Sequence, residues 1–420
     1  MMFVYVISKD GQPLMPTSRF GKVRRLLKNK KAKVVKRCPF TIMLLYEPVN
    51  HVVQEVVLGQ DTGSKHVGVA CVGNDTVLYQ SQIELRDDIK SKMNDKRSHR
   101  RFRRNKLRYR KARWFNRGNS IKKDRYSSTL RSKFDSHVKE IEFCKSILPI
   151  TKIVLETGKF DTQLMEKPWL QQHRWAYQKG VNYGYANARA HALDRDNYTC
   201  QCCGKKHTRL EVHHIIYRSN GGSDDLENLI TLCKDCHDAI HDGTKIFKLK
   251  GKKKSALRYT AQMSVLRSML LKRYPNAIET FGYVTKANRE AMDLDKDHYI
   301  DAVVIASDGQ NIELNSDIFY KKCVAKQSRS MRKGVRGEKP IPLGKVYGFK
   351  KFDKVRYLEQ ECFVKARRSS GNFVLMNIFG NSLDFRPIGG RQNPSYKLLE
   401  RLSTRTSILI ERRKAMPVLS

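Results

Sequence analysis

Short apolar runs separated by glycine and polar residues dominate the first part of this 420-residue chain. Between residues 56 and 85 the apolar and polar positions alternate, which predicts consecutive antiparallel strands. Residues 1–55 are predicted to form a small α+β domain with one short helix among its strands. Further along, an apolar run predicts a strand at 153–156 that ends on a glutamate, and residues 298–307 are predicted to form a helix.

A run of basic residues interrupts this pattern. Twelve of the 22 positions from Lys96 to Arg117 are Lys or Arg, aromatic residues are interleaved, and proline is absent. Because arginine and lysine are good helix formers, the run predicts a long basic helix. It has no single apolar stripe and almost no acidic partners four residues away. A bound polyanion therefore explains the run better than a solvated charged surface does.

The charge of the whole chain points the same way. Lys and Arg number 83 against 41 Asp and Glu, which gives a net charge of +42 and favours a nucleic-acid partner. A ribosomal or chromatin-like protein is the alternative, but a hydrophobic content of 40% is enough for real cores. No run of about 18 apolar residues exists, so we expect no membrane helix and a cytoplasmic protein. Four of the ten cysteines form two CxxC pairs, which indicates zinc in a reducing compartment.

Four residues far apart in the sequence form a first candidate site. Asp61 and Glu156 each end an apolar strand, and carboxylates at the ends of adjacent strands can converge. His298 and Asp301 lie three residues apart on a predicted helix, so they share one of its faces. Hard cations such as Mg²⁺ prefer oxygen ligands of this kind. Two ions about 4 Å apart could activate water, and His298 could accept its proton.

A Cys/His block lies between Glu156 and His298 and forms a second candidate site. Its two CxxC pairs have the spacing of a structural Cys₄ zinc site. The cysteines are Cys200, Cys203, Cys233 and Cys236, and the polar residues between or just after them are His213, His214, Asn228, His237 and His241. A zinc finger that only binds DNA is the alternative, but such a module needs neither adjacent histidines nor a histidine at 241.

The residues around the first site resemble the three split motifs of RuvC-type nucleases, which have the RNase H-like fold. The matching segments are Asp61-Thr62-Gly63-Ser64-Lys65 with Gly68, Val154-Leu155-Glu156, and Asp297-His298-Tyr299-Ile300-Asp301-Ala302. By this resemblance, Asp61, Glu156 and Asp301 would be Mg²⁺ ligands. His298 would be the general base.

The order of residues in the second site resembles the ββα-metal fold of HNH endonucleases. By that resemblance, His214 would be the general base and Asn228 would orient it. His213 and His237 would ligate a single catalytic Mg²⁺, and His241, one helical turn after His237, would be a further ligand. Adjacent strand residues face opposite sides, so the two neighbouring histidines can serve one site only at a strand end or a distortion.

The order of all these parts resembles type II CRISPR effector nucleases. The short spacing and the Pro13-Leu14-Met15-Pro16 start identify the chain as a member of the IscB family, their compact transposon-associated relatives. The implied fold is a multidomain α/β protein with a split RNase H-like domain, divided as follows: 1–55 N-terminal PLMP domain, 56–89 first RuvC segment, 90–125 arginine-rich bridge helix, 126–190 second RuvC segment and linker, 191–243 HNH domain, 244–310 linker and third RuvC segment, and 311–420 β-rich C-terminal domain with strands expected at 345–349 and 373–379.

The family implies an RNA-guided DNA endonuclease that acts as a monomer with a structured guide RNA, called omega RNA, on duplex DNA carrying a short flanking motif. The C-terminal domain would contact that motif and the RNA. HNH would cut the guide-paired strand and RuvC the displaced strand. The bridge helix would bind guide RNA phosphates through Arg97, Arg100, Arg101, Arg103, Arg104, Arg108, Arg110 and Arg113. The alternatives are a guide-independent nuclease of the homing or resolvase kind and a non-catalytic RNA-binding protein.

Overall fold

The chain forms two compact units, one inserted in the sequence of the other. The computed structural model describes residues 3–47, 53–105, 107–109, 126–206, 208–244, 251, 257–325 and 344–414. Unit 1 takes in Met1–Gly158 and Val265–Ser420, and unit 2 is Lys159–Ser264. The chain therefore leaves unit 1 two residues after Glu156 and returns to it more than a hundred residues later.

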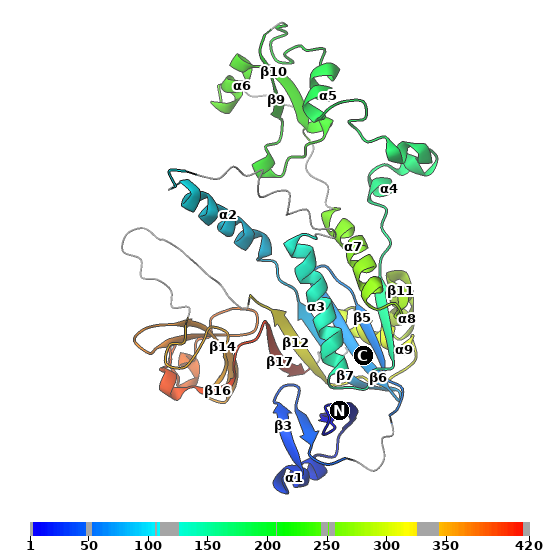
Figure 1. The fold of residues 1–420 in the computed structure, drawn as a ribbon, viewed down its shortest axis with the longest axis vertical. Helices are drawn as coiled ribbons and strands as arrows, with labels where there is room; N and C mark the ends of the chain where they lie inside the picture. The colour runs from blue at the N-terminus through cyan, green and yellow to red at the C-terminus, as the bar shows by residue number, and fades with distance from the viewer. Residues whose placement is uncertain are drawn as a thin grey trace. The chain divides into compact units, whose positions relative to one another are not determined.

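A seven-stranded mixed sheet is the centre of unit 1 (Figure 1). In order across the sheet its strands are β11 (Ile278–Phe281), β8 (Lys152–Thr157), β5 (Val57–Asp61), β6 (His66–Gly73), β7 (Thr76–Glu84), β12 (Asp317–Cys323) and β17 (Ile408–Lys414). The three strands β5, β6 and β7 follow one another antiparallel, which confirms the prediction from the alternating pattern. β8 lies parallel to β5 on one side and to β11 on the other.

Helices cover the two faces of this sheet. Helix α9 (His298–Ser307), predicted with these bounds, packs against β5 and β6, and α3 (Ser128–Lys145) lies on the other face. Side chains along β5 alternate between the faces. Gln60 donates a hydrogen bond of 3.5 Å to the backbone oxygen of His137 in α3. Asp61, the next residue, therefore faces α9.

Two glycines let α9 come unusually close to the strands. A Cβ atom at Gly59 would lie 2.5 Å from the backbone oxygen of Ala302, and one at Gly68 would lie 1.7 Å from the backbone oxygen of His298. Real Cβ atoms do not approach backbone this closely, so these positions require glycine. The contact places the first turn of α9 directly over the ends of β5 and β6.

A buried ion pair holds α3 against the face of the sheet that lies opposite α9. The Lys321 ammonium on β12 lies 2.7 and 2.8 Å from the two carboxylate oxygens of Glu140 in α3. Tyr79 and Ser81 on β7 donate hydrogen bonds of 2.7 and 2.9 Å to the same carboxylate. All four side chains are buried. Because the charges are paired and hydrogen-bonded, their burial fixes α3 against β7 and β12.

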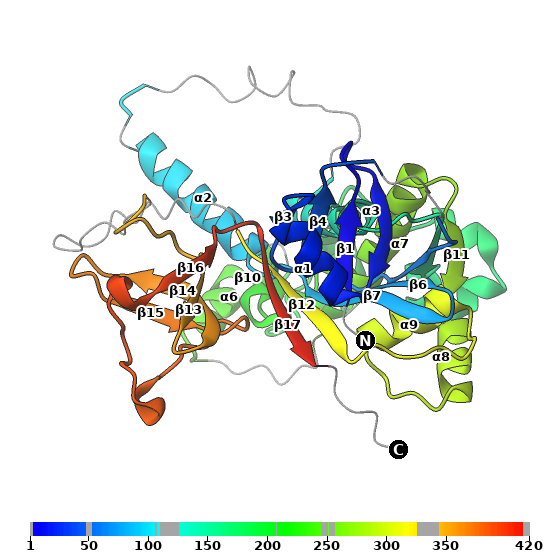
Figure 2. The ribbon, with the colours of Figure 1, turned by 90° about the horizontal axis from the view of Figure 1, so that it is seen from below.

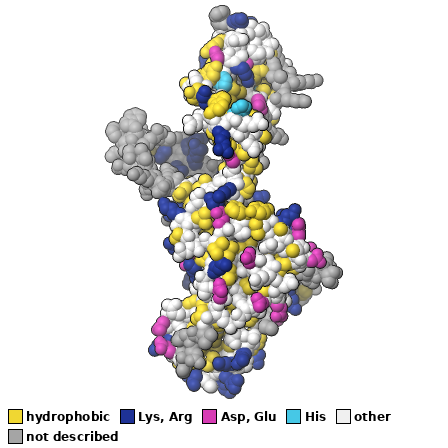
Figure 3. Space-filling view, turned by 90° about the vertical axis from the view of Figure 1, so that its right-hand side faces the viewer, with side chains coloured by type: hydrophobic (Ala, Val, Ile, Leu, Met, Phe, Trp, Pro, Cys, Tyr) yellow, Lys and Arg dark blue, Asp and Glu magenta, His cyan; other side chains and the backbone are white. Residues whose placement is uncertain are grey.

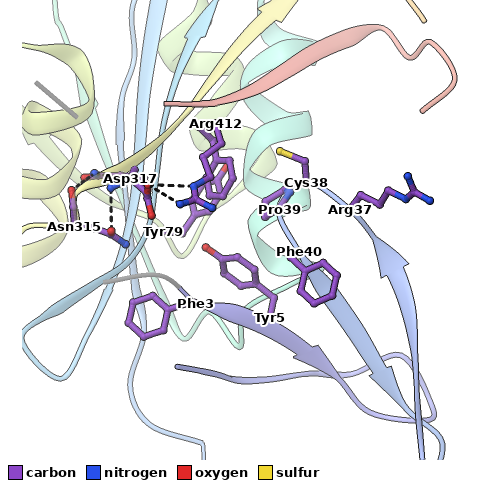
Figure 4. A pocket seen from close by; sticks show the side chains of 12 residues that line it. Phe3, Tyr5, Arg37, Cys38, Pro39, Phe40, Tyr79, Asn315, Asp317 and Arg412 are labelled. Atoms are coloured by element: carbon purple, nitrogen blue, oxygen red, sulfur yellow. Dashed lines mark hydrogen bonds and ion pairs between the residues drawn. The ribbon is translucent and has the colours of Figure 1, made fainter. Parts of the chain in front are cut away.

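The N-terminal part of unit 1 forms a small α+β subdomain, as predicted. Its four-stranded sheet has the order β2-β1-β4-β3, and α1 packs on it through Val23. The elements are β1 (Val4–Ile7), β2 (Pro13–Thr17), α1 (Phe20–Lys28), β3 (Ala32–Lys36) and β4 (Thr41–Leu44). A pocket of about 70 Å³ lies where this subdomain packs on the large sheet (Figure 4). Tyr5 and Phe40 line one side and Asp317, hydrogen-bonded to Arg412, the other.

The C-terminal part differs from the prediction of one separate β-rich domain over 311–420. Its first and last strands, β12 and β17, lie side by side and extend the large sheet (Figure 2). Only the middle forms its own antiparallel sheet, in the order β15-β14-β13-β16. These strands are β13 (Lys354–Tyr357), β14 (Gln360–Arg367), β15 (Phe373–Met376) and β16 (Glu400–Ser403).

One of the two strands predicted in this part is confirmed and the other is wrong. β15 lies within the predicted range 373–379. Residues 345–349 instead form a tight turn closed by an isolated bridge between Val346 and Phe349. Tyr347 and Gly348, at its centre, have φ angles of 49° and 83°, a left-handed conformation that an extended strand excludes.

The predicted basic helix begins as expected. Helix α2 (Ile89–Asn105) contains five of the eight arginines assigned to it, and Ile89 is the one buried residue within it. This agrees with the absence of an apolar stripe. The helix ends at Asn105, earlier than predicted, and residues 107–109 are not helical, so Arg108 lies past the helix, where it is exposed. Arg110 and Arg113 lie outside the described residues.

Unit 2 is built from short elements around a two-stranded antiparallel sheet, β9 (Leu210–His214) and β10 (Leu229–Cys233). Its helices and 3₁₀ turns are α4 (Thr162–Glu166), η3 (Pro168–Gln171), η4 (Arg174–Gln178), α5 (Ala188–Arg195), η5 (Arg218–Asn220), η6 (Leu226–Asn228) and α6 (Lys234–His241). Helix α7 (Arg258–Arg273) begins in the last residues of unit 2 and leads back to β11 in unit 1, and α8 (Gly282–Ala291) follows.

The contact between Gly68 and α9 predicts the effect of adding one methyl group. Gly68→Ala should lower the free energy of unfolding by about 1–3 kcal/mol or more, because the added atom meets backbone that cannot move aside. Gly21→Ala is the matched control: a Cβ at this position in α1 meets nothing within 4 Å. It should be neutral or stabilising by up to about 1 kcal/mol. Urea unfolding of both variants decides, and equal stability would contradict this account of the packing.

Candidate active sites

The four residues of the first predicted site come together at one end of the large sheet. Asp61 and Glu156 are direct neighbours across the parallel strands β5 and β8. His298 is the first residue of α9, where the Asp297 side chain caps the helix by accepting a hydrogen bond from its N–H. The His298 ring nitrogen Nδ1 lies 2.6 Å from Asp61 Oδ2. Asp301 lies one turn further along the same helix.

The acidic groups of this site are held in an environment that disfavours their charge. Burial raises the pKa of Glu156 to about 7, and the nearby carboxylates of Asp61 and Asp301 contribute. Burial and Asp61 also raise the pKa of Asp301. The hydrogen bond with Asp61 raises the pKa of His298. A cluster of carboxylates that repel one another in a partly buried site fits a bound divalent cation, which would relieve this repulsion.

Two further residues belong to this site that the sequence patterns did not reveal. Arg289 on α8 is buried, and its Nε lies 3.0 Å from Asp301 Oδ1. His66, at the start of β6, stacks on the His298 ring with a centroid distance of 5.4 Å. Neither lies in a recognisable motif. Arg289 reaches the site only through the packing of α8 beside α9, and His66 through the hairpin of β5 and β6.

The four cysteines of the second predicted site form one cluster. The sulfur atoms of Cys200, Cys203, Cys233 and Cys236 lie within 4.8 Å of one another. All are free thiols. Burial opposes ionisation of Cys200, but backbone N–H groups of Cys233 and Cys203 outweigh it and lower the pKa to about 6. This tetrad fits a tetrahedral zinc ion. Such an ion would link the start of α6 to the loop before β9.

Three histidines form a separate cluster beside the cysteines. Ring nitrogens of His213, His237 and His241 lie within 4.8 Å of one another. His213 comes from β9, and the other two lie one turn apart on α6. Histidine side chains are visible at the surface of unit 2 in Figure 3, where they are cyan. The convergence of all three supports His213 and His241 beside His237 as one ligand set.

The surroundings of His213 favour its neutral form, in which a ring nitrogen can bind a metal ion. Burial, followed by the proximity of His237 and His241, lowers the pKa of His213 to about 4. Glu211 Oε2 lies 3.2 Å from His237 Nδ1. The position of this carboxylate beside Nδ1 leaves Nε2 of the ring for a metal ion. The three rings therefore fit a divalent ion that prefers nitrogen ligands.

His214 points away from this cluster and is held by a residue that the sequence patterns did not reveal. Its Nε2 lies 2.9 Å from Asp224 Oδ1, and the same oxygen accepts a hydrogen bond of 2.7 Å from Arg218. The hydrogen bonds with His214 and Arg218 lower the pKa of Asp224. Successive residues of β9 face opposite sides, but His214 is the last residue of the strand, the position at which neighbouring histidines can still serve one site.

The side chain of Asn228, predicted to orient His214, makes its hydrogen bonds to backbone groups of the loop after β9. Its fully buried side chain accepts a hydrogen bond from the N–H of Ile216 and donates to the backbone oxygens of Ile216 and Ser223. These contacts hold the loop that follows β9. Asn228 therefore acts on His214 through the loop backbone, because that loop also carries Asp224 to the imidazole.

The predicted phosphate contacts of α2 are accessible. All five of its assigned arginines are exposed: Arg97, Arg100, Arg101, Arg103 and Arg104.

Among the helices that the structure describes, none has the length and apolar character needed to cross a membrane.

Family models match two segments of the chain. Residues 4–180 match the RRXRR protein model, a stretch that includes Asp61, α2 and Glu156. Residues 200–243 match the HNH endonuclease model, which covers the cysteine and histidine clusters.

Two curated proteins each match 61 residues of the chain. Anaredoxin from Nostoc sp. is 34% identical over 61 residues, which are 14% of this chain and 80% of that protein. The type IV methyl-directed restriction enzyme EcoKMcrA from Escherichia coli is 36% identical over 61 residues, 13% of this chain and 22% of the enzyme. The match with the restriction enzyme thus spans less than a quarter of its length.

Among solved structures, Cas9 from Streptococcus thermophilus matches with a TM-score of 0.32 and 15% identity, over 49% of this chain and 29% of that one. The type II-C Cas9 from Actinomyces naeslundii matches with a TM-score of 0.16 and 17% identity, over 42% and 30%. The structural matches are too distant to add to the argument. The RRXRR and HNH matches, in this order on a mixed α/β multidomain chain, support an IscB/Cas9-like nuclease family for this protein.

Proposed function

We propose that this protein is an RNA-guided DNA endonuclease with two different active sites. The observation that carries the proposal is the in-register pairing of Asp61 and Glu156 under a helix that carries His298 and Asp301. Such a site, on a sheet of three antiparallel strands flanked by a parallel one, is what a split RuvC domain of RNase H-like fold requires. The HNH segment supplies a second, independent site in the same chain.

In the outer site, Asp61, Glu156 and Asp301 would hold Mg²⁺. The bound metal would activate water and stabilise the leaving oxygen of the phosphodiester. His298 would take the proton of the attacking water. Because Asp61 engages Nδ1, Nε2 is the ring nitrogen through which this proton would enter. The ion pair with Arg289 holds the Asp301 carboxylate in place.

In the inner site, His213, His237 and His241 would hold one divalent ion. His214 would act as the general base. Asp224 fixes its imidazole at Nε2 and would stabilise the imidazolium that forms when the other nitrogen takes a proton. The Cys₄ cluster would hold structural zinc. Three imidazoles suit transition-metal ions better than Mg²⁺, so the earlier expectation of Mg²⁺ at this site is the weaker of the two choices.

The partners follow from charge and accessibility. The exposed arginines of α2 would bind guide RNA phosphates, with Arg108, Arg110 and Arg113 continuing the contact. The division of the chain into PLMP, RuvC, bridge-helix, HNH and C-terminal segments belongs to this proposal, with β12 and β17 reassigned to the RuvC sheet. The sheet β13–β16 would contact the flanking DNA motif and RNA. A guide-independent nuclease would explain both sites but not this row of exposed arginines.

Two substitutions test the two-site mechanism. The protein is purified with its bound RNA, that RNA is sequenced, and plasmids carrying the matching target are cut with and without it. Asp61→Ala should cut only the guide-paired strand, and His214→Ala only the displaced strand. Each lost activity should fall by about 10²–10⁴-fold or more. Asp10→Ala, at an exposed loop position, is the control and should cut both strands.

Three outcomes would contradict the proposal. Cutting that needs no RNA would favour a guide-independent nuclease. Loss of both cuts in either single variant would contradict two independent sites. No cutting by the wild-type protein with any divalent metal would favour a non-catalytic RNA-binding protein.

The two donor sets predict different metal preferences. Asp61→Ala, which keeps only the inner site, should nick faster with Mn²⁺, Co²⁺ or Ni²⁺ than with Mg²⁺, because its ligands are imidazoles. His214→Ala, which keeps only the carboxylate site, should nick with Mg²⁺ and Mn²⁺ and lose activity with Ni²⁺. Nicking rates are measured across the metal series. Identical preferences in the two variants would contradict the assignment of different donor sets.

The cysteine cluster predicts a selective loss of zinc. Cys203→Ser should lose the structural zinc ion and lower the unfolding temperature of unit 2, because a structural site contributes folding free energy directly. Cys202→Ser is the matched control, since Cys202 lies beside the cluster but outside it. Zinc content after dialysis against a chelator is compared for the two. Equal retention of zinc would show that the four cysteines do not form the site.

A further inference from the structure

Large aromatic side chains stand exposed on the first part of unit 2. Trp169, Trp175 and Tyr183 are 50%, 63% and 65% exposed. Apolar rings of this size normally contribute to a core, and an exposed cluster of them marks a surface that binds something. Neither proposed active site uses these residues.

The segment that carries the rings is folded. Leu170 and Ala176, each the next residue after an exposed tryptophan, are buried. The 3₁₀ turns η3 and η4 hold the backbone around them. Asp161 caps α4, and Tyr177 donates a hydrogen bond of 2.6 Å to the same carboxylate. Leu170 and Ala176 therefore form the packing of this segment, and the two tryptophans are held at its surface.

The exposed groups form one continuous row. The Trp169 and His173 rings lie 6.2 Å apart, and the His173 and Trp175 rings 6.4 Å apart. The Lys179 ammonium lies 5.0 Å from the centre of the Trp175 ring and 5.3 Å from that of Tyr183. We name these five residues the aromatic platform.

Cations are interleaved with the rings of the platform. Residues 167–187 contain Lys167, Arg174 and Lys179 and no Asp or Glu, whereas Asp161 and Glu166 precede this stretch. Aromatic rings interleaved with cations are the combination that binds single-stranded nucleic acid, since unpaired bases stack on the rings and phosphates pair with the cations. A duplex offers no free base faces, and an apolar protein partner would not require the cations.

We propose that the aromatic platform binds the displaced single strand of the DNA target by base stacking. This inference rests on the proposed function, in which the RuvC-type site cuts that strand. The platform begins 13 residues after Glu156, a residue of that site. A strand held there is therefore tethered by a short stretch of chain to the carboxylates that would cut it.

Tryptophan fluorescence tests the contact directly. The chain has three tryptophans, so Trp114→Phe leaves Trp169 and Trp175 as the only tryptophans, whose emission is excited selectively at a wavelength that tyrosine does not absorb. The RNA-bound protein is titrated, without added divalent metal, with a 16-residue oligothymidylate, its duplex with oligodeoxyadenylate, and oligouridylate. The single DNA strand should quench the emission saturably and more weakly at high salt, and the duplex should not. Absence of quenching, or stronger quenching by RNA, would overturn the proposal.

Cleavage tests the role of the platform in the reaction. Trp169→Ala with Trp175→Ala should slow cutting of the displaced strand by roughly 5- to 100-fold and leave cutting of the guide-paired strand unchanged. Phe at both positions should restore most of the rate, because it keeps a ring for stacking. Tyr198→Ala removes an exposed ring of the same unit outside the platform and should change neither rate.

The outcomes separate this inference from the function on which it rests. If the wild-type protein makes both RNA-guided cuts and the double alanine variant does so at the same rates, the platform proposal is wrong and the proposed function stands. Equal slowing of both cuts would assign the platform to folding or to RNA binding and also overturn it. If the wild-type protein makes no RNA-guided cut, the displaced strand is excluded as the occupant even where oligothymidylate quenches.

Discussion

Helix α9 can lie against the sheet only because two glycines leave room for its backbone. At Gly59 and Gly68 a single methyl group would collide with backbone atoms of the helix. Everything in the outer site follows from this approach. It sets His298 within hydrogen-bond distance of Asp61, and it brings Asp301 over the end of the strand pair that carries Glu156. The site is thus fixed by contacts of the backbone rather than by its acidic side chains, whose mutual repulsion opposes their assembly.

The two sites meet the same electrostatic problem with opposite chemistry. In the outer site, burial and neighbouring carboxylates raise the pKa of Glu156 and Asp301, so the protein holds anionic ligands in a place that disfavours them. In the inner site, burial and neighbouring imidazoles lower the pKa of His213, so this imidazole is kept neutral. A bound cation would reduce the repulsion between the carboxylates of the outer site. In the inner site, the lone pairs of the neutral ring nitrogens would bind a cation directly. The first donor set would therefore favour a hard ion and the second an ion that prefers nitrogen ligands.

The sequence was sufficient for those residues whose role depends on local spacing. Strand ends identify Asp61 and Glu156, an i,i+3 step identifies His298 and Asp301, and CxxC pairs identify the cysteine cluster. Residues brought in by tertiary packing carry no such signal: Arg289 arrives on a neighbouring helix and Asp224 on a loop. The same limit explains Asn228, whose motif position is clear but whose hydrogen bonds go to backbone. It also explains β12 and β17, since no local pattern tells a strand of a separate domain from a strand that extends a distant sheet.

The place where unit 2 is inserted explains how one chain can carry both sites. β8 and β11 are adjacent and parallel, with Glu156 opposite Thr280. Parallel neighbours cannot be joined by a tight turn and need a long crossover connection. Unit 2 and α7 occupy this connection, so the insertion interrupts no hydrogen-bonded ladder and leaves the register of Asp61 with Glu156 intact. The cost of closing such a loop grows only with the logarithm of its length, so a whole nuclease domain adds little to the cost of a shorter crossover. The outer site therefore tolerates the inner one because the insertion falls at a connection that had to be long in any case.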